Sequence, residues 1–408
     1  MESQTYIFHQ WPPPPALYSF IDILEPLMPT ETQTHNPIRV LLAAPSLRII
    51  GGQSRQAVRL MGLFQDEPAV KISFVPHNPE LPGLLGWLQN IKYLRTLVTT
   101  VAYCFLLLAR VPKCDLIHIF SASYYSYLCC VAPAILIGKL FRKKIILNYR
   151  SGEAEDHLEN WRTAIPTIKL ADQIVVPSGY LVDVFARFNL KASFIFNIVE
   201  LDRFSYRERK TLRPVFLTSR LLEPLYNVPC VLRAFALIQK NYPEASLTVA
   251  ADGWLRPELE KLAETLGLAN TKFVGFVPFA DMPKLYDSAD IYLTATNIDN
   301  MPSSITECMA SGLNVVTTPG GGAIPFIMTD QETGIIVKTD DHEAMAAGAL
   351  RLLAEPDFAV QLARNAREAS KRFTGNAIKE QWLTLYMQLA NVTSSAAELP
   401  ATWIAKKI

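Results

Sequence analysis

An arginine and two carboxylates stand just beyond short apolar runs of this sequence. Arg220 follows the run VFLTS, and Asp299 and Glu307 are separated by seven residues in the stretch DNMPSSITECMASG. An arginine at the carboxyl end of a strand is well placed to neutralise a diphosphate through bidentate contacts. Two carboxylates at the start of a helix can accept hydrogen bonds from a polyol. Two simpler alternatives stay open: a structural salt bridge for Arg220, and a solvent-facing Glu307 on a capped helix.

Glycine-containing loops follow three other apolar runs. Gly51 and Gly52 come between a strand and a helix, Asp252-Gly253 follows LTVA, and Gly320–Gly322 follow VVTTP. Glycine lets a backbone approach a ligand closely, and loop amides or a helix N-terminus behind it favour an anion. A strand-glycine-helix turn is also common without any ligand, so an ordinary turn remains the alternative for Gly51 and Gly52.

The elements that must position these residues are short, continuous apolar runs separated by segments of helix length. Such runs are typical of parallel strands buried on both faces, and their alternation with helices predicts doubly wound α/β sheets. The alternation occurs in both halves of the chain, so the expected fold is two tandem Rossmann-like domains with ligands in the cleft outside the carboxyl ends of the strands. We expect strands at 38–44, 116–120, 145–149, 173–177, 215–218, 247–250, 272–274, 291–295, 315–317 and 334–337, and helices at 53–64, 257–266, 282–288 and 377–389.

The chain divides into five parts on this basis. Residues 1–37 are proline-rich and aperiodic and are expected to form an arm. Residues 38–202 form the first Rossmann-like domain, which would carry the acceptor, and the charged stretch 203–213 forms the linker. Residues 214–376 form the second, donor-binding domain. Residues 377–408 form a helix and tail that we expect to pack back on the first domain.

The composition excludes several classes of protein. The 408 residues suffice for two domains, and 50% hydrophobic with 19% charged residues is the opposite of a disordered composition. A formal net charge of +1 does not favour a nucleic-acid binder. The six cysteines show no CxxC pair, so neither a metal site nor a disulfide framework is predicted. The N-terminus does not resemble a secretory signal, and the expected location is cytoplasmic.

The stretch from Leu88 to Lys144 is apolar and locally basic, with eight basic residues and one acidic residue. Its charge-free segment 96–109 would rise about 21 Å as a helix, short of a hydrocarbon core of ~30 Å, so we do not expect it to span a membrane. Two interpretations stay open. These segments are either helices covering a sheet with basic residues snorkelling at their ends, or a peripheral contact with an anionic membrane surface.

The order of the motifs resembles that of one enzyme family. After the Gly-Gly loop come DLIH, VVPSGYL, IFNIVELDRF, SR, TVAADG, FVGFV, DMPKLYDSADIYLTAT, DNMPSSITECMASGLNVVTTPGGG and TGIIV. The chain is similar in these motifs to family 4 of the retaining glycosyltransferases, which have the GT-B fold. The resemblance covers roughly residues 38–390 and is strongest in the C-terminal half.

This resemblance implies a metal-independent transferase that passes a sugar from a nucleotide diphosphosugar to a hydroxyl acceptor with retention of configuration. The nucleotide sugar is a co-substrate, and no further cofactor is implied. By analogy Glu307 would hold the nucleotide ribose, Asp299 a sugar hydroxyl and Arg220 the diphosphate, with Gly52 closing over the phosphates. The leaving phosphate would serve as the base for the incoming hydroxyl. The other donor-binding candidates are Gly51, Tyr226, Asp252, Gly253, Ser303, Ser304 and Gly321.

The sequence departs from the family pattern at three positions. Asp299 stands where the family usually has Glu, and Tyr226 where it usually has Lys as a second diphosphate cation. Arg150 replaces a frequent His; it cannot act as a general base but can supply the charge that Tyr226 lacks. The catalytic candidates are Asp299, Arg150 and His157. A surface histidine is the alternative for His157, and His118 is expected to pack near a strand end.

The leading hypothesis is therefore a hexosyltransferase-like enzyme that uses a lipid-linked or membrane-proximal acceptor. It would be cytoplasmic or peripheral on the cytoplasmic face of a membrane, held through residues 88–144. The alternative is a catalytically impaired GT-B protein that binds a nucleotide sugar or regulates a partner. A related GT-B enzyme such as a sugar-nucleotide epimerase is a third hypothesis.

Overall fold

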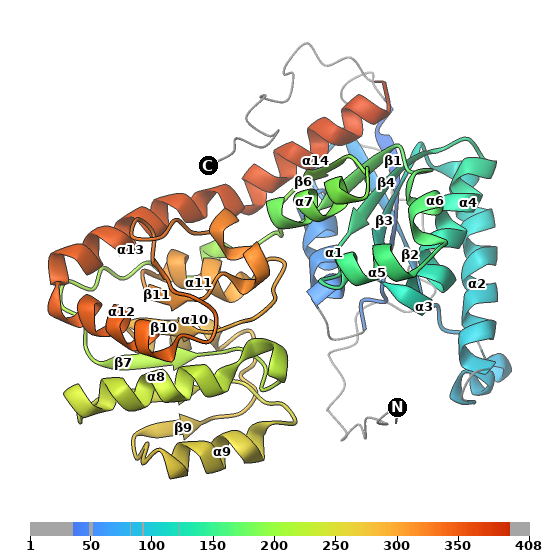
Figure 1. Ribbon diagram of the computed structural model, residues 1–408. Coiled ribbons are helices and arrows are strands. Elements are labelled where there is room, and N and C mark those ends of the chain that lie inside the picture. Colours follow the sequence, from blue (N-terminus) through green and yellow to red (C-terminus); the bar gives the residue numbers. More distant parts are fainter. Residues whose placement is uncertain (1–35, 49–51, 82, 92–93, 122, 392–408) are drawn as a thin grey trace. The chain divides into compact units, whose positions relative to one another are not determined.

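The structure is a computed structural model that describes residues 36–48, 52–81, 83–91, 94–121 and 123–391 (Figure 1). Gly51, nearly all of the predicted arm 1–37 and the tail beyond residue 391 lie outside the described residues. Within residues 36–391 the chain forms two parallel sheets of six strands each, which confirms the predicted fold class.

The first sheet has the strand order β2-β1-β3-β4-β5-β6, with every neighbouring pair parallel. Two of its strands were not predicted. One of them, β2, is the edge strand, where Lys71 and Ser73 interrupt the apolar run, and the other, β6, is three residues long. The strands are β1 (Ile38–Ala44), β2 (Val70–Pro76), β3 (Leu116–Ser121), β4 (Lys144–Tyr149), β5 (Gln173–Val176) and β6 (Ala192–Phe194).

The second sheet has the order β12-β11-β10-β7-β8-β9, again with parallel neighbours. Its interior strands β10 and β11 are buried along their whole length, as expected for a sheet covered on both faces. The strands are β7 (Val215–Thr218), β8 (Ser246–Val249), β9 (Thr271–Phe273), β10 (Ile291–Thr294), β11 (Asn314–Thr317) and β12 (Ile335–Ile336).

Helices cover both faces of each sheet. Proline in the first turn of several of them suits the fixed φ of a helix start, as in α9, α10 and α13. The helices are α1 (Gly52–Leu63), α2 (Leu94–Arg110), α3 (Tyr124–Ser126), α4 (Ala132–Leu140), α5 (Ala154–Asn160), α6 (Ala164–Ile168), α7 (Gly179–Arg187), α8 (Val228–Asn241), α9 (Arg256–Thr265), α10 (Met282–Ser288), α11 (Ser303–Ser311), α12 (His342–Ala354), α13 (Pro356–Ser370) and α14 (Gly375–Leu389).

Alternate residues of each strand enter different cores. In β1, Val40 and Leu42 pack with α1 and with Trp382 and Tyr386 of α14, whereas Leu41 packs with α2 and α4 on the other face. The C-terminal helix α14 therefore covers the first sheet, although it follows the last strand of the second (Figure 1).

Helix α2 is longer than the charge-free segment in the sequence indicates. Its helical stretch runs from Leu94 to Lys113 and has 20 residues. By length and composition alone it could cross a membrane, and 17% of its most apolar 18-residue segment is buried. This length alone does not test the prediction that the segment does not span a membrane. Tyr103 and Leu107 nevertheless pack into the core beside the first sheet, so the helix does cover the sheet as one of the two interpretations expected.

The charged stretch 203–213 is fastened to the second sheet by one buried carboxylate. Asp290, 1% exposed, precedes β10 and accepts hydrogen bonds from Arg207, Arg209 and Arg213. Burial by itself would raise the pKa of Asp290, but the bonds from Arg213 and Arg207 lower it to about 2. The basic residues that make this stretch look like a solvated linker are thus structural.

Candidate functional site

The residues singled out in the C-terminal half gather at one edge of the second sheet. Arg220 follows β7, Asp299 follows β10, the three glycines follow β11 and Asp252 follows β8, and these strands are neighbours. Between β7 and β10 the strand order reverses its direction along the chain. Ligands of open α/β sheets bind outside the carboxyl ends of strands at such a point. The fold therefore places Arg220 and Asp299 where a ligand is expected.

Arg220 is held by three side chains. Its guanidinium forms an ion pair with Asp299, donates to the hydroxyl of Ser304 over 3.4 Å, and lies 4.4 Å from the centre of the Tyr226 ring. Burial alone would lower the pKa of Arg220, but Asp299 and the nearby tyrosines raise it overall. The salt-bridge alternative for Arg220 is thus present, and its partner is Asp299, the residue predicted to bind a sugar hydroxyl.

The loop that carries Asp299 is shaped by its own side chain and by the glycine loop. One carboxylate oxygen of Asp299 accepts from the backbone N–H of Met301 (3.1 Å), and its own N–H donates to the carbonyl of Gly320 (3.1 Å). Gly321 has φ +70°, a conformation that L side chains rarely adopt, and it approaches the carbonyl of Asn297. The two loops therefore support each other at the sheet edge.

Glu307 lies in the second turn of α11 and is 5% exposed. The solvent-facing alternative for this residue is therefore wrong. Its Oε2 accepts a hydrogen bond of 2.9 Å from the hydroxyl of Tyr286, which lies on α10. Burial raises the pKa of Glu307, while Tyr286 and the guanidinium of Arg59 on α1 oppose the shift. Ser303 and Ser304 open the same helix, and Ser304 accepts from Arg220, so the positive end of the helix dipole lies beside Arg220.

The Asp252-Gly253 turn has a packing function. A Cβ at Gly253 would lie 2.5 Å from the backbone oxygen of Leu222, so only glycine fits between these two loops. The carboxylate of Asp252 accepts from the backbone N–H of Gly253 (2.9 Å) and pairs with Arg256 (3.3 Å). This turn brings Leu222, two residues beyond Arg220, against the end of β8.

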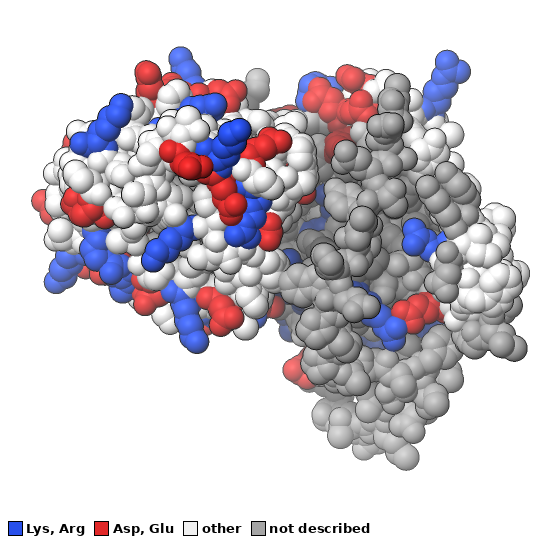
Figure 2. All heavy atoms as spheres, turned by 90° about the horizontal axis from the view of Figure 1, so that it is seen from below, with Lys and Arg blue, Asp and Glu red and all other residues white. Residues whose placement is uncertain are grey.

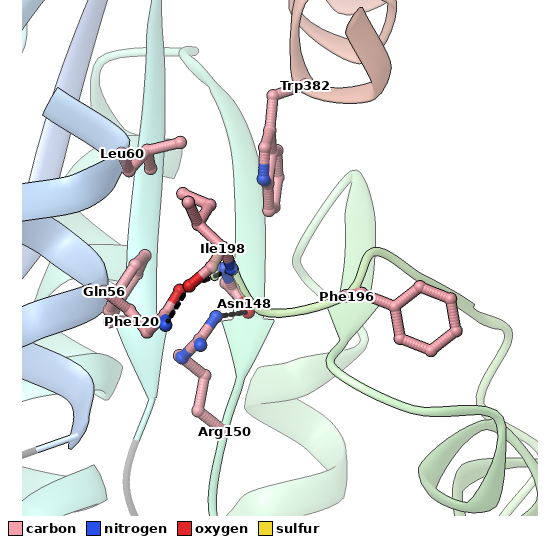
Figure 3. Close-up of a pocket in the computed structure, with 8 residues that line it drawn as sticks. All are labelled: Gln56, Leu60, Phe120, Asn148, Arg150, Phe196, Ile198 and Trp382. Atoms are coloured by element: carbon pink, nitrogen blue, oxygen red, sulfur yellow. Dashed lines mark hydrogen bonds between the residues drawn. The ribbon is translucent and has the colours of Figure 1, made fainter. Parts of the chain in front are cut away.

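On the first sheet Arg150 follows β4 and lines a small pocket that is partly open to solvent. Figure 3 shows Arg150 directed toward Asn148, with Trp382 of α14 on the other side of the pocket. The Arg150 guanidinium donates to the Asn148 side chain (3.3 Å) and to Asn197, and its centre lies 4.8 Å from the ring centre of Phe120. Gly52 opens α1 with nothing within 4 Å of a Cβ placed there, so that position has room beside it.

The structure buries both predicted histidines. His157 is 0% exposed, its Nδ1 lies 2.7 Å from the Tyr149 hydroxyl, and it is surrounded by aromatic rings, so the surface alternative is wrong and the side chain belongs to the core. Burial lowers the pKa of His157 to about 4. His118 packs against Trp382 and bonds to Tyr386 and Asn148, as expected for a residue near a strand end.

Several residues at the site were not singled out from the sequence. Tyr286, Asn197 and Asn300 contact Glu307, Arg150 and the Arg150 carbonyl respectively. Tyr286 and Asn300 stand inside motifs already noted, DMPKLYDSADIYLTAT and DNMPSS, which is the one signal that would have drawn attention to them. Asn197 lies in IFNIVELDRF, where an isolated amide gives no indication of its partner.

Two parallel six-stranded α/β sheets with polar groups at the carboxyl ends of their strands define the class of protein: the chain has the GT-B fold. Residues 200–369, in the C-terminal half of the chain, match the family described as glycosyl transferases group 1.

Solved structures agree on the fold. HepE of Anabaena in complex with UDP has a TM-score of 0.68 at 15% identity, covering 86% of this chain and 100% of that one. The sucrose-phosphate synthase of Thermosynechococcus elongatus has a TM-score of 0.65 at 19% identity, covering 87% and 100%. At these identities the likeness shows the fold alone.

Curated relatives are similar over part of their length. A GalNAc-alpha-(1->4)-GalNAc-alpha-(1->3)-diNAcBac-PP-undecaprenol alpha-1,4-N-acetyl-D-galactosaminyltransferase of Campylobacter jejuni is 28% identical over 39% of this chain and 44% of its own length. A GDP-mannose-dependent alpha-(1-6)-phosphatidylinositol monomannoside mannosyltransferase of Mycolicibacterium smegmatis is 26% identical over 65% and 75%. The chain spans less than half the length of the first two curated relatives that it matches.

Proposed function

We propose that this chain is a metal-independent retaining glycosyltransferase that transfers a sugar from a nucleotide diphosphosugar to a hydroxyl acceptor. One observation carries the proposal. Arg220, Asp299 and the α11 helix that bears Glu307 converge at the point of the second sheet where the strand order reverses, the place where open α/β sheets bind nucleotides. The match of residues 200–369 to the glycosyl transferases group 1 family supports the same reading.

The proposed roles follow from the charge of each group. Glu307, positioned by the Tyr286 hydroxyl, accepts hydrogen bonds from the nucleotide ribose. The diphosphate takes the place of Asp299 on Arg220, which releases the Asp299 carboxylate to a hydroxyl of the sugar. As the bond from the anomeric carbon to the phosphate oxygen breaks, Arg220, the α11 N-terminus and the amides of Gly320–Gly322 stabilise the departing charge. The acceptor oxygen bonds to that carbon from the same face, and its proton passes to the leaving phosphate.

Calorimetric titration with UDP- and GDP-sugars, together with an assay for released nucleotide, tests this proposal. The Glu307→Ala variant should lose nucleotide affinity, whereas Glu368→Ala, a change at an exposed surface carboxylate, should not. Absence of binding and of release with every donor and acceptor would refute the assignment. Equal nucleotide affinity in wild type and Glu307→Ala would refute the role of Glu307 alone.

A catalytically impaired nucleotide-sugar-binding protein is the second candidate, and one observation favours it. Tyr226 covers Arg220 at the position where a second cation is usual, and Asp299 already neutralises that arginine. Less charge is therefore available to stabilise a leaving diphosphate. Tight donor binding without release of nucleotide for any acceptor would support this candidate, and a Tyr226→Lys variant should then gain measurable nucleotide release.

The proposed acceptor is lipid-linked or membrane-proximal, and the exposed face of α2 supports it. Leu97 and Phe105 are 63% and 68% exposed, and Val101 and Leu108 lie on the same face, a surface that we call the α2 apolar face. Figure 2 shows the edge of the molecule that holds α2 as surface without charged side chains. Arg95, Arg110 and Lys113 stand at the ends of this helical stretch, where they would meet anionic headgroups.

The basic cluster at the other end of this region is weaker than its sequence indicates. Lys139 and Lys144 both pair with Asp172, and the Lys143 ammonium donates to the carbonyl of Pro112 over 3.2 Å. The apolar side chains are therefore expected to contribute more to membrane affinity than these lysines. The phosphatidylinositol named for the Mycolicibacterium smegmatis relative and the undecaprenol named for that of Campylobacter jejuni are consistent with a lipid acceptor.

Flotation with vesicles of phosphatidylglycerol and phosphatidylcholine tests the membrane contact. Wild type should float at low salt, and a Leu97→Glu/Phe105→Glu double variant should not. Trp254→Glu, which changes a side chain 61% exposed near the second sheet, is the matched control and should float like wild type. A wild-type chain that stays in the soluble fraction at low salt would remove the membrane part of the proposal.

A further inference from the structure

Arg150 differs from most partly buried arginines of this chain in having only uncharged partners. Its guanidinium contacts the side-chain oxygens of Asn148 and Asn197 and the ring of Phe120. Within the described residues no carboxylate forms an ion pair with it, whereas Arg209 and Arg220 each have one. A cation withdrawn from water without a counter-ion is unfavourable, so such a group is kept where a ligand supplies the negative charge.

The side chains packed behind Arg150 hold its guanidinium in place and add no second charge. The Asn148 oxygen accepts from Arg150, so the Asn148 amide donates to Nε2 of His118 (3.1 Å). The proton of the imidazole is then on Nδ1, which donates to the Tyr386 hydroxyl (2.8 Å). Burial, and then the charge of Arg150, lower the pKa of His118 to about 3, so this histidine is neutral. Burial lowers the pKa of Arg150 to about 10, and it remains charged at neutral pH.

The position of Arg150 connects this charge to the proposed donor site. Its carbonyl accepts from the side chain of Asn300 (3.3 Å), the residue that follows Asp299. The partner of its guanidinium, Asn197, donates its backbone N–H to the sulfur of Met301 (2.9 Å). Arg150 is therefore joined on two sides to the loop that holds the proposed sugar-binding carboxylate.

We propose that Arg150 is the cation of an anion-binding subsite at the carboxyl end of the first sheet, which binds a phosphate group of the substrates. The inference rests on the proposed transferase function. Two sources of that phosphate share the same chemistry: the diphosphate of the donor, for which Arg150 would replace the cation missing at Tyr226, and a phosphate carried by the acceptor. Gln56 and Trp382, which line the same pocket, give it one polar and one aromatic wall (Figure 3).

Isothermal titration of the full chain with UDP, GDP and inorganic phosphate separates the two sources. If Arg150 binds the donor diphosphate, Arg150→Gln should weaken UDP or GDP binding by at least about tenfold, the effect of losing a charge-assisted contact. If it binds an acceptor phosphate, nucleotide affinity should stay unchanged. Inorganic phosphate should then bind to nucleotide-saturated wild type but not to nucleotide-saturated Arg150→Gln.

Two further variants separate loss of the subsite from loss of structure. Arg150→Lys keeps the positive charge and should recover part of the lost affinity, which a purely structural arginine would not show. Arg187→Gln removes the same charge from a surface ion pair with Glu155 and should bind like wild type. Equal affinities of Arg150→Gln and wild type for nucleotide and for inorganic phosphate would overturn the proposal.

The same titrations distinguish failure of the subsite from failure of the proposed function. Binding of inorganic phosphate through Arg150 by a chain that binds no nucleotide would retain the subsite and refute the transferase. Nucleotide binding and release that do not depend on Arg150, together with inorganic phosphate binding that does not depend on it either, would retain the transferase and refute the subsite.

Discussion

Replacing Asp290 by asparagine should destabilise the chain, because this carboxylate is the shared partner of three arginines. The Asp290 side chain is 1% exposed and that of Arg209 beside it is 0% exposed. Both charges are therefore withdrawn from water. The backbone N–H of Arg213 donates to Asp290 over 2.7 Å. Asparagine keeps the size of the side chain and can still accept this bond. The change therefore removes the negative charge while disturbing the packing little.

The expected loss of unfolding free energy is about 3 kcal/mol. The pKa of Asp290 falls from an ordinary 3.8 to about 2, and this depression corresponds to roughly 2.5 kcal/mol of preference for the charged form. Leaving Arg209 buried without its counter-ion adds to this loss. Removing one partner of a buried ion pair typically costs about 3–5 kcal/mol in all. Arg209 retains backbone carbonyl partners such as Tyr286 and Ser311, which limits the loss.

Urea unfolding followed by circular dichroism at pH 7 and at a series of lower pH values measures this effect. The carboxyl has a lowered pKa in the folded state, so its contribution is present above pH ~4 and is lost as the pH falls toward 2. Wild type and Asp290→Asn should therefore differ at pH 7 and converge below pH 4. Asp287→Asn, which changes a 63% exposed partner of Arg207, is the control and should cost less than about 1 kcal/mol. A difference below about 1 kcal/mol at pH 7, or one that does not change with pH, would refute this account.

Three other predictions follow from buried groups. Glu307→Gln should weaken nucleotide binding roughly tenfold in calorimetry through loss of a charged acceptor, and an unchanged affinity would contradict the ribose contact. Gly253→Ala should lower the unfolding free energy by about 2 kcal/mol, since its Cβ would lie 2.5 Å from the Leu222 carbonyl oxygen; an unchanged thermal midpoint would show that the loops separate freely. The free energy of unfolding should also fall between pH 6.5 and pH 4, because the histidines of the unfolded chain bind protons in this range whereas the buried histidines of the folded chain stay neutral. Equal urea midpoints at pH 7 and pH 5 would contradict this. The pKa values of the histidines concerned are lowered by burial to about 4, about 3 and about 4 at His77, His118 and His157.

The amino-acid sequence by itself determined the fold class and the positions of most strands. Strands buried on both faces leave continuous apolar runs, and β1 and β7 begin and end at the predicted residues. The edge strand β2 and the three-residue β6 lack such runs and were missed. The motif order was likewise readable, because each motif follows the strand that positions it.

Only the tertiary structure decided which of these residues meet. Arg220 and Asp299 form an ion pair because β7 lies beside β10, although the two residues are separated by 79 positions in the chain. The same long-range packing buries His157 among aromatic rings and leaves Arg150 without a carboxylate among the described residues. Local periodicity reports which face of an element is apolar, whereas the partner of a charged side chain depends on strand order and on packing between distant segments, which no local pattern of residues encodes.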